Sequence, residues 1–290
     1  MSTVYLNGEY LPKDRARISP DDRGFIFGDG IYEVVRVIEG RIFEWDAHAE
    51  RMTRGLAGLR IGFGARDVDG MREVCERLVR DNGLTVGEAT VYAQVSRGTA
   101  QRIHHFPPAG TPPTVYAFAA KFTVPRELRE KGGVAITYPD YRWARCDLKT
   151  VNLLGAVLAR QAAAEAGAYE AILLRDGVMT EGAATNAFTV VDGILRTYPL
   201  SNYILPGITR RVVVELAEET GIAVVQEPVT HAELPLASEL FVCGTTTDVT
   251  PVVTLDGRPV GNGKPGPVTT KLRDALAVRM YAAVAVSSSR

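Results

Sequence analysis

The chain has 290 residues, enough for two compact domains with cores of their own. Hydrophobic residues make up 46% and charged residues 23%, an ordinary soluble composition, and a formal net charge of −1 gives no electrostatic reason to expect a nucleic-acid or membrane-surface partner. No apolar run reaches the length of a membrane span, and the first ten residues lack the pattern of a signal peptide. The three cysteines are far apart and form no CxxC pair, so we expect no disulfide framework, no metal site and a cytoplasmic location.

The beginning of the chain predicts a hairpin, a glycine-rich loop and a strand. Asn7-Gly8 is a strong two-residue turn signal between apolar residues. Residues 21–33 contain three glycines with interleaved acids and lead into a strand over 31–38. No Gly-Lys-Ser/Thr follows, so this is not the phosphate loop of an NTPase. Tyr32 is among the first residues after the loop, where binding sites are commonly built.

Two helices and two strands are expected next. We expect Asp46 to cap a first helix that carries Arg51, and a second helix to run over 68–81. A lone arginine on a helix is most often a surface charge, so Arg51 by itself indicates little. Strands are predicted over 89–96 and 115–119.

The segment after the strand at 89–96 carries Arg102 and His104, two residues apart. On an extended segment, both side chains project to the same face. A guanidinium with a histidine donor beside it suits a carboxylate ligand. A solvated basic loop is the alternative. The adjacent His104 and His105 would point to opposite faces, which makes them a poor metal chelate.

Residues 121–133 are polar and interrupt the strand and helix pattern. We interpret them as an interdomain linker. This divides the chain into a small N-terminal domain over 1–120 and a larger C-terminal domain over 134–290.

A strand predicted over 134–139 is followed, after Lys149, by a helix that should end at Gly167. Its apolar positions are expected to share one face, which comprises Leu153, Leu154, Val157, Leu158, Gln161 and Ala162. Lys149 would lie at the mouth of this helix, where the helix dipole and burial both favour a neutral amine. A nucleophilic or Schiff-base lysine needs that state. A solvated loop lysine is the simpler alternative from this stretch alone.

The remaining third predicts hairpins, two helices and two sets of anion donors. The hairpin at Asp176-Gly177 places Glu181 at a strand end. The backbone N–H groups of Ile208 and Thr209 open a helix and could bind a phosphate, although a capped helix with nothing bound is the commoner case. Gly244 and the three threonines after it offer further donors. A C-terminal helix is expected from about residue 268.

Together these features form the inventory of a pyridoxal-phosphate enzyme that acts on amino acids: a lysine, a carboxylate at a strand end, two phosphate-binding turns and a pair for a substrate carboxylate. The motifs are Asp22-Arg23-Gly24, residues 27–34 (FGDGIYEV), Arg97-Gly98-Thr99, Arg142-Trp143, residues 146–159 (CDLKTVNLLGAVLA), Thr180-Glu181-Gly182 and residues 205–210 (LPGITR). With them the chain resembles the class IV (fold type IV) aminotransferases over essentially its whole length, and within that family the D-amino acid aminotransferases.

The resemblance implies a role for each site residue. Lys149 would hold the cofactor covalently and move a proton, and Glu181 would pair with the pyridine nitrogen with Arg142 as its partner. The phosphate would be bound by Arg51, Ile208, Thr209 and Thr245, Leu205 would pack against the ring, and the substrate carboxylate would be bound by Tyr32, Arg102 and His104. Gly244 departs from the family pattern, since relatives often carry a small hydroxyl residue there. The departure implies that one phosphate hydrogen bond is missing or mediated by water.

The resemblance also implies an α/β (α+β) fold, with a small N-terminal α/β domain, a larger C-terminal domain with a β-barrel-like core, and pyridoxal 5′-phosphate between them. A homodimer with a shared active site is implied, because the loop with Arg102 and His104 usually reaches in from the neighbouring subunit.

The reaction implied is a ping-pong transfer from a D-amino acid such as D-alanine or D-glutamate to 2-oxoglutarate or pyruvate. A branched-chain L-amino acid aminotransferase and an aminodeoxychorismate lyase on the same fold are alternatives, as is a cofactor-binding protein without turnover. The Arg102/His104 pair favours the D-amino acid enzyme.

Overall fold

The computed structural model describes residues 2–285, and the chain folds into two compact units. The first comprises the chain up to Thr123 together with Leu148–Asn152, and the second comprises Val124–Asp147 and Leu153–Ala283. The division predicted at residues 121–133 stays a prediction. That segment does not lack regular structure, since it holds the last residue of strand β6 and all of helix α4.

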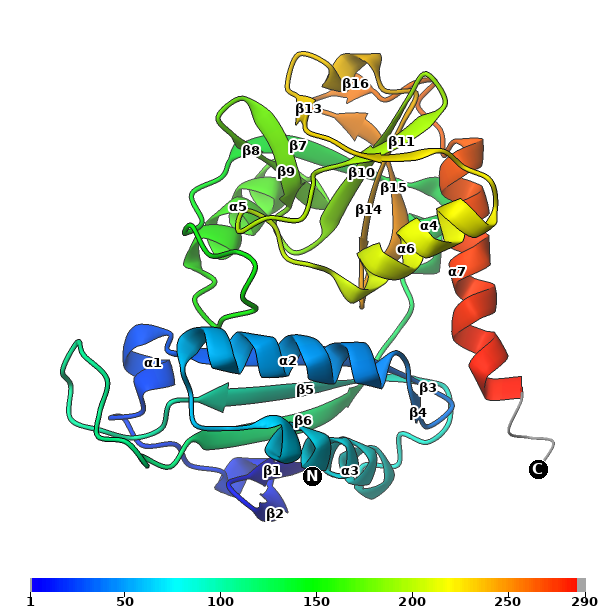
Figure 1. Ribbon diagram of the computed structural model, residues 1–290. Helices are drawn as coiled ribbons and strands as arrows, with labels where there is room; N and C mark the ends of the chain where they lie inside the picture. The colour runs from blue at the N-terminus through cyan, green and yellow to red at the C-terminus, as the bar shows by residue number, and fades with distance from the viewer. Residues whose placement is uncertain (1, 286–290) are drawn as a thin grey trace. The chain divides into compact units, whose positions relative to one another are not determined.

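The first unit is built on one antiparallel sheet of six strands in the order β2-β1-β6-β5-β3-β4 (Figure 1). Its strands are β1 (Thr3–Leu6), β2 (Glu9–Pro12), β3 (Gly30–Ile38), β4 (Arg41–Ile42), β5 (Glu88–Ser96) and β6 (Thr114–Lys121). Its helices are η1 (Lys13–Arg15), α1 (Arg23–Phe27), α2 (Trp45–Leu59) and α3 (Ala65–Asp81).

Alternation along the strands separates the two faces of this sheet. The odd-numbered apolar residues of β3, β5 and β6, among them Val35, Val91 and Ala117, are buried and form one core with α2 and α3. The other face carries a row of aromatic rings, in which Tyr32 stacks on Tyr92. The side chains of Tyr32 and its neighbour Glu33 therefore lie on opposite faces of the sheet.

The glycine-rich loop expected over residues 21–33 contains a short helix, α1. The Asp22 side chain accepts a hydrogen bond from the Gly24 N–H, which caps the first turn. Gly28 ends the helix with a φ of 66°, a conformation that a residue without a Cβ adopts freely. The prediction that Asp46 caps α2 was wrong: the N-cap is Glu44, and Asp46 lies in the first turn.

The second unit is built on a mixed ten-stranded sheet in the order β12-β11-β10-β14-β15-β7-β8-β9-β13, with β16 paired to β15. Its strands are β7 (Gly133–Pro139), β8 (Glu170–Arg175), β9 (Val178–Gly182), β10 (Asn186–Val191), β11 (Ile194–Thr197), β12 (Val224–Gln226), β13 (Val229–Thr230), β14 (Glu239–Gly244), β15 (Asp248–Leu255) and β16 (Arg258–Pro259). Its helices are α4 (Arg126–Lys131), α5 (Leu154–Glu165), α6 (Ile208–Glu219), η2 (Leu234–Leu236) and α7 (Pro267–Ala285).

This second sheet curves on itself. Strands β9 and β10 are far apart in the strand order, yet they approach each other, and the Gly182 N–H donates to the Thr185 carbonyl at 2.7 Å. The expected mixed α/β fold with a barrel-like second sheet is thus confirmed. None of the helices that the structure describes is both long and apolar enough to cross a membrane.

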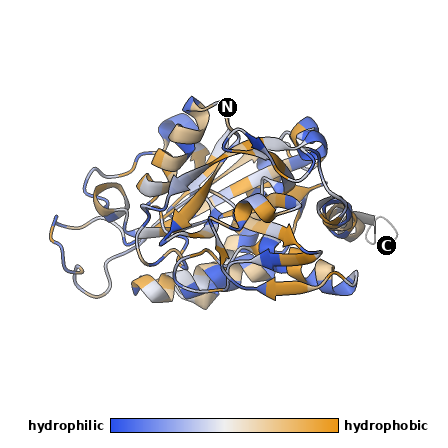
Figure 2. Cartoon of the chain, turned by 90° about the horizontal axis from the view of Figure 1, so that it is seen from above, coloured by the Kyte–Doolittle hydropathy of each residue, from blue (hydrophilic) through white to orange (hydrophobic). Residues whose placement is uncertain are grey.

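The helices combine apolar and polar stretches (Figure 2), and the face that α5 buries in its own unit is not the predicted apolar stripe. The helix packs through Ala159 and Ala163 against a cluster that includes Ala171, Leu173 and Ala183. The predicted stripe is largely exposed, with Leu154, Val157 and Leu158 at 67%, 55% and 48% of their full surface. Small side chains let the helix approach the sheet closely, whereas the leucines point away from this core.

We expect the core under α2 to carry much of the stability of the first unit. Leu56 is fully buried on this helix, so Leu56→Ala should lower the free energy of unfolding by about 3 kcal/mol, because it removes apolar contacts and leaves a cavity. Val86→Ala, at a valine that is 81% exposed, is the control and should change it by less than about 0.5 kcal/mol. Urea denaturation measures both, and equal effects would contradict the assignment of this core.

Candidate active site

Lys149 lies in a short extended segment beside β3 and not in a helix. Its carbonyl accepts a hydrogen bond from the Tyr32 N–H at 3.0 Å, and the next residue, Thr150, pairs with Ile31 in an isolated β-bridge. The ammonium nitrogen is 4.3 Å from the centre of the Tyr32 ring. Because α5 begins only at Leu154, the expected position at a helix mouth was wrong. Sheet pairing holds this lysine in place.

Arg51 belongs to a buried cluster with Glu33 and His48. Its guanidinium donates to both oxygens of the Glu33 carboxylate, at 2.8 and 2.7 Å, and His48 Nδ1 is 2.7 Å from the same carboxylate. All three side chains are at most 5% exposed. Arg51 is therefore not a surface charge, and its expected role toward a phosphate stays a prediction.

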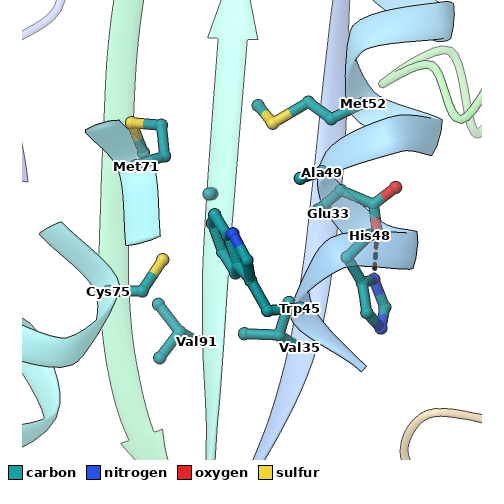
Figure 3. A pocket seen from close by; sticks show the side chains of 10 residues that line it. Glu33, Val35, Trp45, His48, Ala49, Met52, Met71, Cys75 and Val91 are labelled. Atoms are coloured by element: carbon teal, nitrogen blue, oxygen red, sulfur yellow. Dashed lines mark hydrogen bonds and ion pairs between the residues drawn. The ribbon is translucent and has the colours of Figure 1, made fainter. Parts of the chain in front are cut away.

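The electrostatics of this cluster follow from burial and pairing. Burial alone would raise the pKa of Glu33, but Arg51 and His48 outweigh it and hold that pKa below its ordinary range. Burial lowers the pKa of His48, with smaller contributions from Arg51 and Lys149. Beside the cluster, α2 and α3 enclose a small apolar cavity with Trp45 and Met71 in its wall (Figure 3).

Arg102 and His104 lie in the loop of the first unit that follows β5. Both are exposed, and both approach the ring of Phe27: the Arg102 guanidinium carbon is 5.5 Å and the His104 ring centre 5.7 Å from its centre. Tyr32, the third predicted carboxylate ligand, makes its own contacts with Tyr92 and Lys149.

In the second unit, Glu181 is buried at the end of β9 and is surrounded by donors. Arg142 forms an ion pair with it, and the Asn186 amide donates to it at 2.7 Å. The Leu205 N–H lies 3.1 and 3.2 Å from its two oxygens. The sequence prediction missed Asn186, although an amide at the start of the otherwise apolar strand β10 was a signal.

A second carboxylate orients Arg142. Asp140 accepts from its guanidinium at two positions, both at 2.8 Å, and also pairs with Arg175 at 3.1 Å. Burial nevertheless dominates at Glu181 and raises its pKa to about 7, against the opposing effect of Arg142. The site thus contains a buried carboxyl that can gain or lose a proton near neutral pH.

Both predicted phosphate-binding turns lie in the second unit. Helix α6 begins at Ile208 after Gly207, without any side-chain cap, and both Ile208 and Thr209 are buried. Thr245 lies in the turn between β14 and β15, beside Gly244. A Cβ added at Gly244 would meet nothing closer than 3.7 Å, so the departure from the family pattern leaves space and not a clash.

The turn that carries Thr245 is held from α4. Arg129 donates to the carbonyls of Thr247 and Thr246 at 3.2 and 3.1 Å and forms an ion pair with Asp248. Arg129 lies in the segment that was interpreted as a linker.

We expect the pH dependence of unfolding to report the raised pKa of Glu181. The pKa of Glu181 is about 7 in the folded protein and ordinarily 4.5, so the folded state holds the proton more tightly than the unfolded state. The stability that this proton contributes is fully present below pH 4.5 and is lost as the pH rises through 7. The unfolding free energy of Glu181→Gln relative to the original protein should therefore rise by about 3 kcal/mol from pH 5 to pH 8. Urea denaturation of cofactor-free protein at both pH values measures this.

Glu33→Gln is the matched control, because Glu33 is equally buried but has a lowered pKa. The stability that ionisation of Glu33 contributes is present above pH 4.5 and is lost only as the pH falls further. The difference in unfolding free energy between Glu33→Gln and the original protein should therefore stay constant from pH 5 to pH 8. A Glu181→Gln difference that is also constant would show that Glu181 titrates at its ordinary pKa.

Comparison with known proteins identifies the family. The model of the family "Amino-transferase class IV" matches residues 30–255. The chain is 40% identical to a D-alanine aminotransferase of Staphylococcus aureus (95% of this chain, 97% of that protein) and 38% identical to one of Bacillus licheniformis (94% and 95%). Its fold is similar to that of the branched-chain amino acid aminotransferase of Escherichia coli, with a TM-score of 0.89 and 29% identity over 95% of this chain and 93% of that one. The branched-chain aminotransferase of the archaeon Thermoproteus uzoniensis, described with norvaline, gives a TM-score of 0.82 and 26% identity over 96% and 94%. This chain belongs to the class IV aminotransferase family.

Proposed function

We propose that this class IV aminotransferase moves the amino group of a D-amino acid, such as D-alanine or D-glutamate, to a 2-oxo acid such as 2-oxoglutarate or pyruvate in a ping-pong reaction. The observation that carries the proposal is the pairing of Arg102 and His104 beside Phe27. This pair supplies the donors that a carboxylate needs, on a chain 40% identical to D-alanine aminotransferases over 278 residues. The similarity to branched-chain enzymes supports the shared fold at lower identity.

The cofactor of this reaction is pyridoxal 5′-phosphate, which when bound supplies an aldehyde for the amino group and a ring that accepts electrons. The donor set of the chain fits it. Lys149 is the amine for the aldehyde, and Glu181 is a buried carboxyl for the ring nitrogen. With its pKa raised to about 7 by burial, Glu181 can hold a proton at that nitrogen. Arg142 and Asn186 keep its carboxyl group oriented.

The phosphate group meets a suitable set of residues in the second unit. The backbone N–H groups at the start of α6, at Ile208 and Thr209, favour an anion because no side chain caps them. In the same unit we assign Thr245 as a further donor and Leu205 as the residue that packs against the ring. Arg51, on α2 of the first unit, is assigned as a further phosphate ligand. The space at Gly244 is large enough for a water molecule to replace the missing hydroxyl group.

The substrate would be bound and deprotonated by residues of the first unit. Arg102, His104 and Tyr32 bind and orient the carboxylate. Lys149, as the free amine, would be the base that takes the proton from the substrate Cα and the acid that gives it back. Pairing with β3 at Lys149 and at the next residue, Thr150, fixes the backbone, so the side chain of Lys149 supplies the motion that the transfer needs.

The half-reaction without an acceptor tests this function. Protein loaded with pyridoxal phosphate is mixed with D-alanine or with L-leucine, and the absorbance of the pyridoxal form is followed. We expect conversion to the pyridoxamine form with D-alanine alone, and none with Lys149→Ala. Conversion with L-leucine alone would assign the chain to the branched-chain enzymes. Conversion with neither would indicate the lyase or a protein without turnover.

We also propose that the protein is a cytoplasmic homodimer whose subunits share active-site residues. The exposed apolar face of α5, with Leu154, Val157 and Leu158, supports a partner surface. The three cysteines are free and buried, as suits a reducing compartment.

Leu154→Glu should turn the dimer into a monomer at micromolar concentration, because it places a charge in the apolar contact. Sedimentation velocity measures this. Val278→Glu, at a valine that is 69% exposed on α7, is the control and should leave the dimer intact. A dimer that tolerates Leu154→Glu would exclude this face.

A further inference from the structure

The loop that carries Arg102 and His104 lies between β5 and β6, outside any helix or strand. Both side chains are exposed. An exposed arginine on an irregular loop would occupy many conformations. A ligand that binds only one of them pays the lost conformational entropy, which lowers its affinity. The loop therefore needs support if the pair is to bind a carboxylate well.

Helix α1 supplies this support at the backbone. The two segments lie side by side at one end of the first unit (Figure 1). The Arg23 guanidinium donates to the carbonyl of Ile103, the residue between Arg102 and His104, at 2.7 Å. Its Nε donates to Asp29 at 2.9 Å, and its side chain is only 4% exposed. The middle of the Arg-x-His segment is thus fixed to a buried ion pair.

The same Asp29 holds the base of the loop through Arg97. Arg97 donates to both oxygens of Asp29, at 2.7 and 2.9 Å, and packs its guanidinium 3.7 Å from the centre of the Phe106 ring. Phe106 follows the His pair closely in sequence. Both ends of the segment are therefore anchored to one carboxylate.

Phe27, the last residue of α1, supports the side chains themselves. The guanidinium carbons of Arg23 and Arg102 lie 4.6 and 5.5 Å from the centre of the Phe27 ring, and the centre of the His104 ring lies 5.7 Å from it. An aromatic face attracts a guanidinium and restricts its orientations. One ring thus contacts both side chains of the pair.

We propose that Phe27 is a positioning residue for the substrate carboxylate, which acts through Arg102 and His104 and does not touch the substrate. The inference rests on the proposed function, because it presumes that the pair binds a carboxylate. It adds α1 to the residues that determine affinity for the 2-oxo acid.

Steady-state kinetics with D-alanine and 2-oxoglutarate test the proposal. Phe27→Ala should raise KM for 2-oxoglutarate about five-fold and change kcat less than about two-fold, because it disturbs uniform binding and not the proton transfer. Arg102→Ala should raise KM further, with cofactor affinity retained. Phe27→Ala added to Arg102→Ala should raise KM by less than it does in the original protein, since one of the two residues through which Phe27 acts is then absent.

Phe25→Ala is the matched control, a phenylalanine on the same helix that is 78% exposed. It should leave KM unchanged. If Phe27→Ala behaves like Phe25→Ala while Arg102→Ala raises KM, the positioning role is wrong and the proposed function stands.

A second measurement needs no turnover. The chain has four histidines, and the NMR signal of His104 in the cofactor-loaded protein can be assigned by its loss in His104→Gln. Phe27→Ala should move this signal and Phe25→Ala should not. If Arg102→Ala leaves KM unchanged, the carboxylate role of the pair fails. The positioning role of Phe27 toward the substrate then fails with it. Where Arg102→Ala does raise KM, a His104 signal that Phe27→Ala leaves unshifted overturns the contact through which Phe27 is proposed to act.

Discussion

The removal of the Glu181 carboxyl from water is the constraint around which the second unit is arranged. An ionised carboxylate in such a place is tolerated only with donors close by. They come from distant parts of the chain: Arg142 follows β7, Asn186 begins β10, and the Leu205 N–H precedes α6. The ends of several elements must therefore meet for the carboxyl to be buried at all. The same elements carry the turns that suit a phosphate.

The two buried glutamates show how partners decide the charge state. Glu33 shares its carboxylate with Arg51 and His48, and their attraction outweighs burial, so its pKa is lowered. Glu181 also faces an arginine, yet its pKa is raised to about 7. Part of the difference lies in Asp140, which pairs with Arg142 and itself raises the pKa of Glu181. An arginine shared between two carboxylates stabilises each of them less, which leaves Glu181 able to exchange a proton near neutral pH.

Much of the fold could be predicted from local patterns, because hairpin turns, strand alternation and helix ends are coded by neighbouring residues. The family and the mixed α/β fold came instead from the resemblance carried by the sequence motifs, such as residues 27–34 and 146–159. The apolar stripe of α5 could be found from its spacing, but its exposure could not, since periodicity shows that a face is apolar and not what covers it. Likewise, sequence spacing suggested a helix dipole at Lys149, whereas pairing with β3 holds it. The contacts of Arg129 with Thr246 could not be found at all, because they join residues 117 positions apart without any local signal.

A common device holds the irregular segments of both units. Loop carbonyls have no ladder partner, and a buried carbonyl without a donor is costly. In several places an arginine pairs with an aspartate and directs its remaining N–H groups to such carbonyls. These pairs are Arg23 and Arg97 with Asp29, Arg129 with Asp248, and Arg175 with Asp140. Their guanidinium groups hold the carbonyls of Ile103, Leu59, Arg60, Thr246, Thr247, Arg142 and Trp143. The aspartate neutralises the charge of the arginine and fixes the plane of its guanidinium group. Several N–H donors of that group then point to backbone carbonyls outside the strands. Lysine, with one compact ammonium group, could not satisfy the carboxylate and two carbonyls together. The segments that carry Arg102, Thr245 and Arg142 are therefore held by hydrogen bonds from arginine side chains to their backbone carbonyls, in place of the backbone pairs that hold strands.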